Sequence, residues 1–365
     1  MNDSTTRSAA GPPPESDAIP SAPSPSPSPP AGEGRAEARS RWRSVAWFAF
    51  GTIVLGSAFA SVLALFAASA WLADLAVHFR VQYLATGGLA LGVLAIRRSL
   101  ALTVAALATI ALNAGPVAGL LTATPLPSTS AAVGVPLTIA SSNVFFLNHD
   151  HAATVAWARR ARPDVLLFIE VTAEWRRGLA PLETDYPYFQ YVTDQHHDGL
   201  LLFSRWPLTD VVTRADDAGP EPCPVIFATL TRDGRPLRLA AIHSAWPMRP
   251  TDARQRNQDL AVLAAAAARR GPLPFIGIGD LNISPFSPHF QDLLREGGLR
   301  NAATGFGWLP TWPAPAPFLG IQIDHALVSP EVEVRRFERG PSNGSDHLAI
   351  MLSVSIPPQP QPLTR

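Results

Sequence analysis

The chain has 365 residues, of which 47% are hydrophobic and 16% are charged, and its formal net charge is zero. It contains no lysine and a single cysteine, Cys223, so a Walker A loop, a Schiff-base lysine, a thiolate zinc site and an intramolecular disulfide are all excluded. Neutrality also argues against a nucleic-acid-binding protein that depends on bulk attraction to phosphate.

The first part of the chain predicts a disordered tail followed by a membrane region. Residues 1–43 are rich in proline and small residues, and this tail ends in four arginines. Residues 44–72 then run without a charge, which exceeds the roughly 20 residues needed to cross a bilayer. The long tail and the length of this run argue against a signal peptide.

Two further uncharged runs lie within the predicted transmembrane region, residues 44–121. Leu100–Leu121 is long enough to span a bilayer. Val81–Ile96 is short, and becomes a plausible span if Val77 and Phe79 extend it; the alternative is a buried or re-entrant helix. We therefore expect about three transmembrane helices.

The arginines predict the orientation of these helices. Positive charge precedes the first span and recurs at Arg97 and Arg98, between the second and third. Loops with excess arginine stay in the cytoplasm. An odd number of spans then places everything after Leu121 on the opposite, extracytoplasmic side.

After a linker at residues 122–135, the pattern changes to short apolar runs that alternate with helical segments. Over residues 136–356 this pattern predicts an α/β domain with mixed sheets and helices outside. The RDGR segment, Arg232–Arg235, predicts a hairpin turn with Asp-Gly at its centre. Residues 357–365 are again predicted to be a disordered tail.

Polar residues stand where the apolar runs end, and this is how a sheet presents a site at one edge. Each alone has a structural explanation as a turn former, a helix-capping acid or a core histidine, but their joint occurrence favours a site. In FIGIGDLN the carboxylate has no lysine or arginine beside it, so its partner is distant or a bound cation. The candidates are Asn143, Glu170, His243, Asp280, Asn282, Asp324, Asp346 and His347.

The chemical character of this set is definite. Carboxylates, carboxamides and histidines without thiolates suit a hard divalent cation such as Mg²⁺ or Mn²⁺. Such a cation bridges to phosphate oxygens, while histidines and amides donate hydrogen bonds and protons to a phosphoryl group that gains charge. The set therefore predicts phosphoester chemistry.

The segments GDLN, IDHALVS and GSDHLAI, in this order after an IE at the end of an early strand, resemble the endonuclease/exonuclease/phosphatase superfamily over residues 136–356. SPFSPHF, the TWP at Thr311–Pro313 and the three-span region are similar to its membrane-anchored bacterial branch. The resemblance implies a four-layer α/β sandwich, two mixed β-sheets flanked by helices. It also implies a multi-pass protein of the bacterial inner membrane.

The resemblance implies roles for the candidate residues. Glu170 and Asp346 match metal-binding carboxylates, Asn143 matches an asparagine near metal and phosphate, and Asn282 matches the amide that holds the phosphate. Further matches imply catalytic roles. Asp280 matches the residue that orients or deprotonates the attacking water, and His347 matches the characteristic histidine, with Asp324 as its orienting partner. His243 matches the histidine that binds phosphate or protonates the leaving oxygen. Whether Asp280 or His347 is the general base stays open.

Two positions depart from better-known branches. Phe145 stands where the DNA-repair endonucleases carry an acid, and Trp206 where the pancreatic deoxyribonucleases carry a glutamate. We expect a membrane-anchored, Mg²⁺- or Mn²⁺-dependent phosphoester hydrolase, with a phosphodiester as the expected substrate and an extracytoplasmic site. The alternatives are a sphingomyelinase-like phospholipase, a nuclease, and a non-catalytic receptor that retains the fold. The substrate could thus be a lipid or a nucleic acid, and no protein partner is inferred.

Other polar and aromatic residues have two interpretations. His196 and His197 are a metal pair or part of a solvated loop, and Arg205 faces the site or holds a loop. The loop aromatics form a substrate rim, touch the bilayer or pack in an ordinary way. They are Trp246, Phe286, Trp308 and Trp312.

Overall fold

The computed structural model describes residue 11 and residues 31–125, 127–128, 134–193, 199–214 and 224–358. His196, His197 and Cys223, most of the predicted N-terminal tail and residues 359–365 lie outside this described part.

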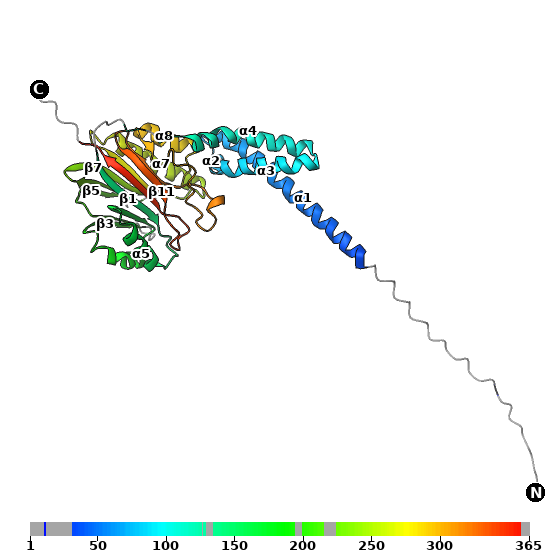
Figure 1. The fold of residues 1–365 in the computed structure, drawn as a ribbon, viewed down its shortest axis with the longest axis horizontal. Helices are drawn as coiled ribbons and strands as arrows, with labels where there is room; N and C mark the ends of the chain where they lie inside the picture. Colours follow the sequence, from blue (N-terminus) through cyan, green and yellow to red (C-terminus); the bar gives the residue numbers. More distant parts are fainter. Residues whose placement is uncertain are drawn as a thin grey trace, which may run out of the picture. The chain divides into compact units, whose positions relative to one another are not determined.

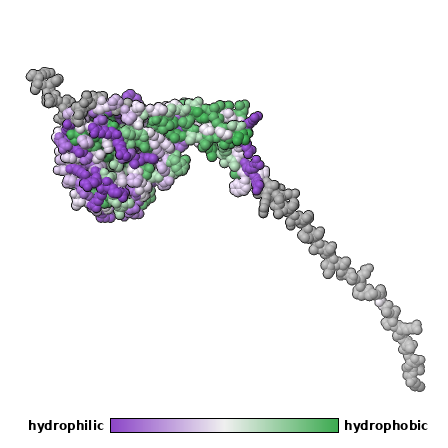
Figure 2. Space-filling view, in the orientation of Figure 1, coloured by the Kyte–Doolittle hydropathy of each residue, from purple (hydrophilic) through white to green (hydrophobic). Residues whose placement is uncertain are grey.

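The N-terminal helical region consists of α1 (Ala31–Leu63), the 3₁₀ turn η1 (Ala64–Phe66), α2 (Trp71–Val77), α3 (Arg80–Arg97) and α4 (Leu100–Thr122). Two segments are long and apolar enough to cross a membrane, Arg39–Phe66 and Leu100–Thr122. Helices α2 and α3 are bent by 62° relative to each other, and make a third span if they cross together. Figure 2 shows that the surface of this region is mostly apolar, whereas the surface of the α/β domain that follows it in the sequence has mixed polarity.

Two details differ from the sequence-based prediction. Residues 31–43 of the expected disordered tail are helical, in keeping with their alanines, glutamates and arginines, which favour helices. The predicted first span is present as Arg39–Phe66, but it ends before residue 72. After η1 the backbone is extended at Ala70, and a separate helix, α2, begins at Trp71.

Within the described residues, the α/β domain contains two six-stranded sheets (Figure 1). The strands of the first sheet are, in spatial order, β11 (Glu333–Arg339), β12 (Ile350–Ile356), β1 (Val135–Asn143), β2 (Val165–Ile169), β4 (Gly199–Ser204) and β3 (Tyr188–Thr193). Those of the second are β5 (Leu208–Arg214), β6 (Val225–Arg232), β7 (Arg235–His243), β8 (Phe275–Asp280), β10 (Asp324–Val328) and β9 (Arg300–Asn301). Each sheet is mixed, because β1–β2 and β7–β8 are parallel and the other pairs are antiparallel.

The two sheets pack face to face and helices cover their outer faces. Side chains such as Leu167 and Ile278 form the shared core between the sheets. The outer face of the first sheet packs against α5 (His151–Ala161) and α6 (Ala173–Leu179). The outer face of the second packs against α7 (Pro250–Ala268) and α8 (Pro288–Gly297). The predicted four-layer sandwich is confirmed.

The β6–β7 connection confirms the predicted hairpin. Arg232 pairs with Arg235, and the two residues between them, Asp233 and Gly234, have φ angles of 49° and 72°. A turn with positive φ at both central positions matches the twist of the flanking strands, which explains the Asp-Gly sequence.

Candidate active site

The strand register brings the predicted polar residues of each sheet to the same end of its strands. In the first sheet, Asn143 at the end of β1 pairs with the end of β2, and Glu170 follows directly. In the second sheet, His243 at the end of β7 pairs with Asp280 at the end of β8. Asp324 begins β10 opposite Asp280. Parallel strands end at the same edge, so these side chains gather without any long excursion of the chain.

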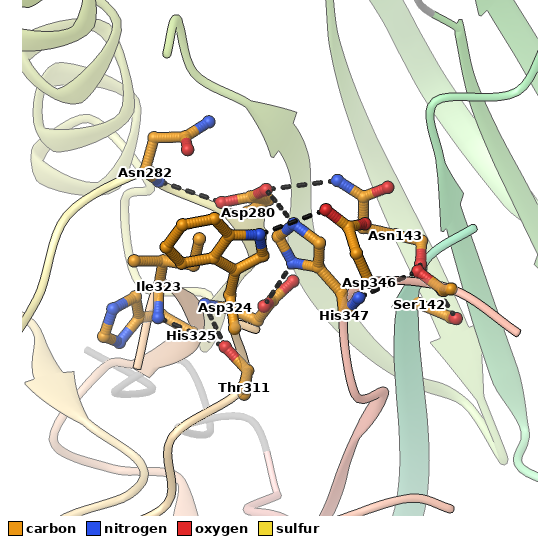
Figure 3. Close-up of polar contacts among 12 residues, drawn as sticks. Ser142, Asn143, Asp280, Asn282, Thr311, Ile323, Asp324, His325, Asp346 and His347 are labelled. Carbon is orange, nitrogen blue, oxygen red and sulfur yellow. Dashed lines mark hydrogen bonds and ion pairs between the residues drawn. The ribbon is translucent and has the colours of Figure 1, made fainter. Parts of the chain in front are cut away.

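Asn143 connects the two sheets. Its Nδ2 donates to Glu170 Oε1 at 2.7 Å, within the first sheet, and to Asp280 Oδ2 at 3.2 Å, in the second. Asn143 and Asp280 are both buried. Figure 3 shows this contact beside His347 and Asp346, which point toward the same small region.

His347 lies between two carboxylates. Its Nδ1 hydrogen-bonds to Asp324 Oδ2 at 2.9 Å, and its Nε2 is 3.8 Å from Asp280 Oδ2 (Figure 3). His243 approaches the same oxygen of Asp280, with 3.9 Å between Nε2 and Oδ2. One carboxylate oxygen therefore faces two imidazoles.

Burial and charge shift the pKa values of this group. Burial, then the neighbouring charge of Asp324, raises the pKa of Asp280 to about 6. Burial alone would lower the pKa of His347, but the charges of Asp324, Asp280 and Asp346 outweigh it and raise the pKa to about 10. His347 is thus an imidazolium at neutral pH when only these side chains surround it.

Several side chains of the site carry atoms that can coordinate a divalent cation. One ligand-type atom each from Asp280, Asp324 and His347 lie within 4.8 Å of one another, but His347 offers a lone pair to a cation only when its ring has lost a proton. Asp346 Oδ2 accepts from Trp312 Nε1 at 3.1 Å, whereas its buried Oδ1 has no hydrogen-bond partner among the described residues. A buried carboxylate oxygen without a donor is costly unless a cation or water meets it. The site is thus rich in carboxylate oxygens, which are the ligands that a hard cation prefers.

Asn282 and Glu170 have unusual backbone conformations. Asn282 has φ of 48°, and Glu170 has φ of 60°. The N–H of Asn282 donates to Asp280 Oδ1 at 2.9 Å, and its Nδ2 donates to the carbonyl of Ser244 at 2.9 Å. Strained conformations of non-glycine residues persist where the surroundings over-determine them, as in functional sites.

Two supporting residues escaped the sequence-based candidate list. Ser345 Oγ donates to the carbonyl of Asn143 at 2.7 Å and accepts from the N–H of His347 at 3.0 Å. Thr311 Oγ accepts from the N–H of Asp324 at 3.2 Å. Ser345 lies inside the GSDHLAI segment, so its position in that segment was an available signal. Nothing in the sequence near Thr311 indicated a contact with Asp324.

Several other residues lie elsewhere. Trp206 does not face His243: its Nε1 is 3.4 Å from Asp164 Oδ1, just before β2, at the sheet edge opposite the site. Its correspondence to the deoxyribonuclease glutamate was wrong. Arg205 stacks over Tyr186, 5.0 Å from the ring centroid, and so holds a loop. Phe286 packs against Ala64, Ala67 and Val77 of the helical region.

The chain resembles known proteins in sequence and in fold. The sequence model of the Endonuclease/Exonuclease/phosphatase family matches residues 140–347, which is more than half of the chain. No curated protein matches the chain.

Solved structures show the same fold at low sequence identity. An endonuclease/exonuclease/phosphatase from Beutenbergia cavernae DSM 12333 is 18% identical, with a TM-score of 0.53 over 62% of this chain and 73% of that one. D. rerio TDP2, solved with a single-strand DNA product, is 16% identical, with a TM-score of 0.51 over 60% of this chain and 99% of that one. A family protein from Bacteroides thetaiotaomicron is 14% identical, with a TM-score of 0.50 over 61% and 98%. The chain belongs to the endonuclease/exonuclease/phosphatase family.

Proposed function

We propose that the chain is a membrane-anchored, divalent-cation-dependent hydrolase of phosphoesters, and that phosphodiesters are its substrates. The observation that carries this proposal is the continuous contact from Asp324 through His347 and Asp280 to Asn143 and Glu170. This arrangement brings a positively charged histidine, a buried carboxylate and oxygen ligands suited to a cation together at one end of the strands. A non-catalytic receptor would have no need to retain so many buried charges in mutual contact.

The side chains divide the proton transfers between them. Asp280 Oδ2 faces the imidazoles of both His347 and His243, and is the acceptor best placed to orient and deprotonate an attacking water. His347, whose Nδ1 is fixed by Asp324, directs its other N–H toward charge that develops on the phosphoryl oxygens. His243 delivers a proton to the leaving oxygen. Asn143 and Asn282 position the phosphoryl group.

Glu170, Asp346 and Asn143 are the residues that we propose hold Mg²⁺ or Mn²⁺. Glu170 accepts one hydrogen bond at each oxygen, from Asn143 Nδ2 and from the N–H of Phe146, which fixes its direction. Asp346 Oδ1, which has no hydrogen-bond partner among the described residues, is available to coordinate such a cation. When bound, the cation neutralises phosphoryl oxygens and acts as a Lewis acid.

A lipid phosphodiester is a second candidate substrate. An enzyme that hydrolyses it is a phospholipase of the sphingomyelinase type. Gln82, near the start of α3, donates to the carbonyls of Leu319 and Gly320, beside the short helix η3 (Pro317–Leu319). Phe318 in this helix is 71% exposed, and Trp246, three residues after His243, is 62% exposed. Exposed apolar side chains, here Phe318 next to the residue that Gln82 of α3 contacts, favour contact with lipid.

We also propose the location of the site. The arginines that flank the apolar helices favour a multi-pass protein of the bacterial inner membrane, with its catalytic domain outside the cytoplasm. The other alternative for the substrate is a nucleic acid, and the enzyme is then a nuclease.

A substrate panel with the full chain in lipid nanodiscs tests the proposal. It contains bis(p-nitrophenyl) phosphate, single- and double-stranded DNA, sphingomyelin and inositol phosphates, each with Mg²⁺, Mn²⁺ or EDTA. We expect cation-dependent hydrolysis that Asp280→Asn abolishes. The matched control is Asp292→Asn, because Asp292 pairs only with the surface residue Arg295 among the described ion pairs. Hydrolysis that survives Asp280→Asn, or that persists in EDTA, would refute the proposal.

A further inference from the structure

The loop between β8 and α8 carries part of the active site and also touches the helical region. It begins at Leu281, directly after Asp280, and includes Asn282. Farther along, His78 Nδ1 and Ser284 Oγ are 2.8 Å apart. Phe286 packs against Ala64, Ala67 and Val77. The loop therefore lies between the active site and the membrane helices.

Asp74 of α2 makes the strongest of these contacts. Its two carboxylate oxygens accept from Ser287 Oγ, at the start of α8, and from Arg256 Nη2, in α7. Asp74 and Arg256 are 2% and 1% exposed, so the ion pair is almost completely removed from water. A buried charge that loses its partner is strongly destabilised, which makes each residue dependent on the other.

Arg256 continues from this pair to the active site. Its Nη1 donates to the carbonyl of Asn282 at 3.3 Å, and its Nε donates to Asn257 Oδ1 at 2.9 Å. The N–H of the same Asn282 donates to Asp280 Oδ1. Two residues, Arg256 and Asn282, thus connect α2 to the carboxylate that faces both imidazoles.

We propose that Asp74 and Arg256 are positioning residues for the hydrolase, through which the membrane-side helix α2 holds Asp280 and Asn282 in their reactive geometry. The inference rests on the proposed function for its kinetic consequence. Asn282 adopts φ of 48°, which is unfavourable for a non-glycine residue and needs support from its surroundings. Arg256 supplies that support at the carbonyl, and Asp74 orients Arg256. The catalytic domain separated from residues 51–122 would retain the site residues but lose this support.

The kinetic test compares Asp74→Asn with a control in the full chain in nanodiscs. Asparagine keeps the size of the side chain but has a single oxygen, so its NH₂ group faces one of the two donors, Arg256 or Ser287, which then has no acceptor. With bis(p-nitrophenyl) phosphate and saturating Mg²⁺, we expect kcat to fall by roughly 10- to 100-fold, because small displacements of reacting groups are costly, while KM changes little. The control is Asp164→Asn, which breaks the ion pair with Arg232 at the opposite sheet edge. It should lower thermal stability and leave kcat unchanged.

Two further measurements keep the inference falsifiable. Arg256→Lys keeps a positive charge beside Asp74, but a single ammonium group cannot reach both Asp74 and the carbonyl of Asn282, so its kcat should lie between those of the wild type and Asp74→Asn. Amide hydrogen exchange should be faster over residues 281–287 in Asp74→Asn and unchanged there in Asp164→Asn. A folded Asp74→Asn chain with wild-type kcat and wild-type exchange would overturn the inference. If the wild-type chain hydrolyses no substrate, the proposed function fails, and the exchange of residues 281–287 still decides whether α2 holds this loop.

Discussion

His347 lies where a proton donor is held in one direction. Asp324 fixes its Nδ1, and the raised pKa keeps both ring nitrogens protonated. Because such a group typically contributes on the order of 10² to 10⁴ in rate, we expect His347→Ala to remove most of kcat. Asp324→Asn should lose much of the same factor. The double variant should be little worse than His347→Ala, since residues that act as a unit are not additive.

A double-mutant cycle on kcat measures this coupling, with thermal melts as the control for folding. Additive losses would show that Asp324 and His347 act separately. A fully active His347→Ala would remove His347 from the mechanism.

The pKa of His347 also predicts how stability depends on pH in the metal-free chain. The folded pKa of about 10 lies above the ordinary value of 6.5, so the folded state binds this proton more tightly than the unfolded state. The resulting stability is fully present below pH 6.5 and is lost as the pH rises toward 10. In EDTA, the melting temperature of the wild type should approach that of His347→Gln across this window. A constant difference between the two proteins from pH 6.5 to 10 would contradict the assignment.

The sequence located the polar residues that gather at one end of the strands better than it located the contacts that support them. Asp280 and His243 stand at the ends of apolar runs, a position that periodicity reveals because strand ends gather at a sheet edge. Arg256 gave no such signal. It lies on a helix, its partner Asp74 is 182 residues away, and its burial depends on how the domain meets α2. Contacts between such distant elements are fixed by tertiary packing, which a local pattern does not record.

Strand β8 requires glycine at one position. Gly279 precedes Asp280, has φ of 155°, and would place a Cβ 1.8 Å from the carbonyl oxygen of Ile242 in the parallel neighbour β7. Only glycine allows β7 and β8 to approach so closely beside the site. Gly279→Ala should therefore destabilise the chain by at least about 3 kcal/mol. Its control is Gly277→Ala, whose Cβ would meet a side-chain atom of Leu263 at 3.2 Å.

Thermal or denaturant unfolding of the two glycine variants provides the measurement. We expect Gly277→Ala to cost much less, because Leu263 can adjust its rotamer whereas a strand carbonyl is held by the sheet. Equal stabilities of the two variants would show that β7 and β8 separate easily.

The helical elements show where hydropathy alone is insufficient. The uncharged run of residues 44–72 predicted a first span, which the structure has at Arg39–Phe66, but the run continues past the end of that segment into α2. The next helix, α2, contains Asp74, whose partners Arg256 and Ser287 belong to the catalytic domain. A hydropathy pattern records how apolar a segment is, and does not record that the segment after it binds a folded domain.

At the scale of the whole molecule, the side of the membrane depends on the number of spans. Two apolar helices would leave the catalytic domain on the same side as the N-terminus, and three would place it on the opposite side. The arginines before the first span and at Arg97 and Arg98 favour three. Alkaline phosphatase fused after Leu121 should therefore be active, and a fluorescent protein that matures only in the cytoplasm should be dark. The reverse pattern would mean that α2 and α3 form a re-entrant segment.

The central claim, a cation-dependent phosphoester hydrolase at this site, is tested most directly by one titration. Turnover of bis(p-nitrophenyl) phosphate by the full chain in nanodiscs is measured against Mg²⁺ concentration, for the wild type and for Glu170→Gln. Glu170→Gln keeps the shape of the side chain and removes its charge. We predict that wild-type turnover saturates with Mg²⁺ and vanishes in EDTA, and that Glu170→Gln needs roughly 10 to 100 times more cation for half-maximal turnover. Turnover in EDTA, or identical titration curves for the two proteins, would contradict the account.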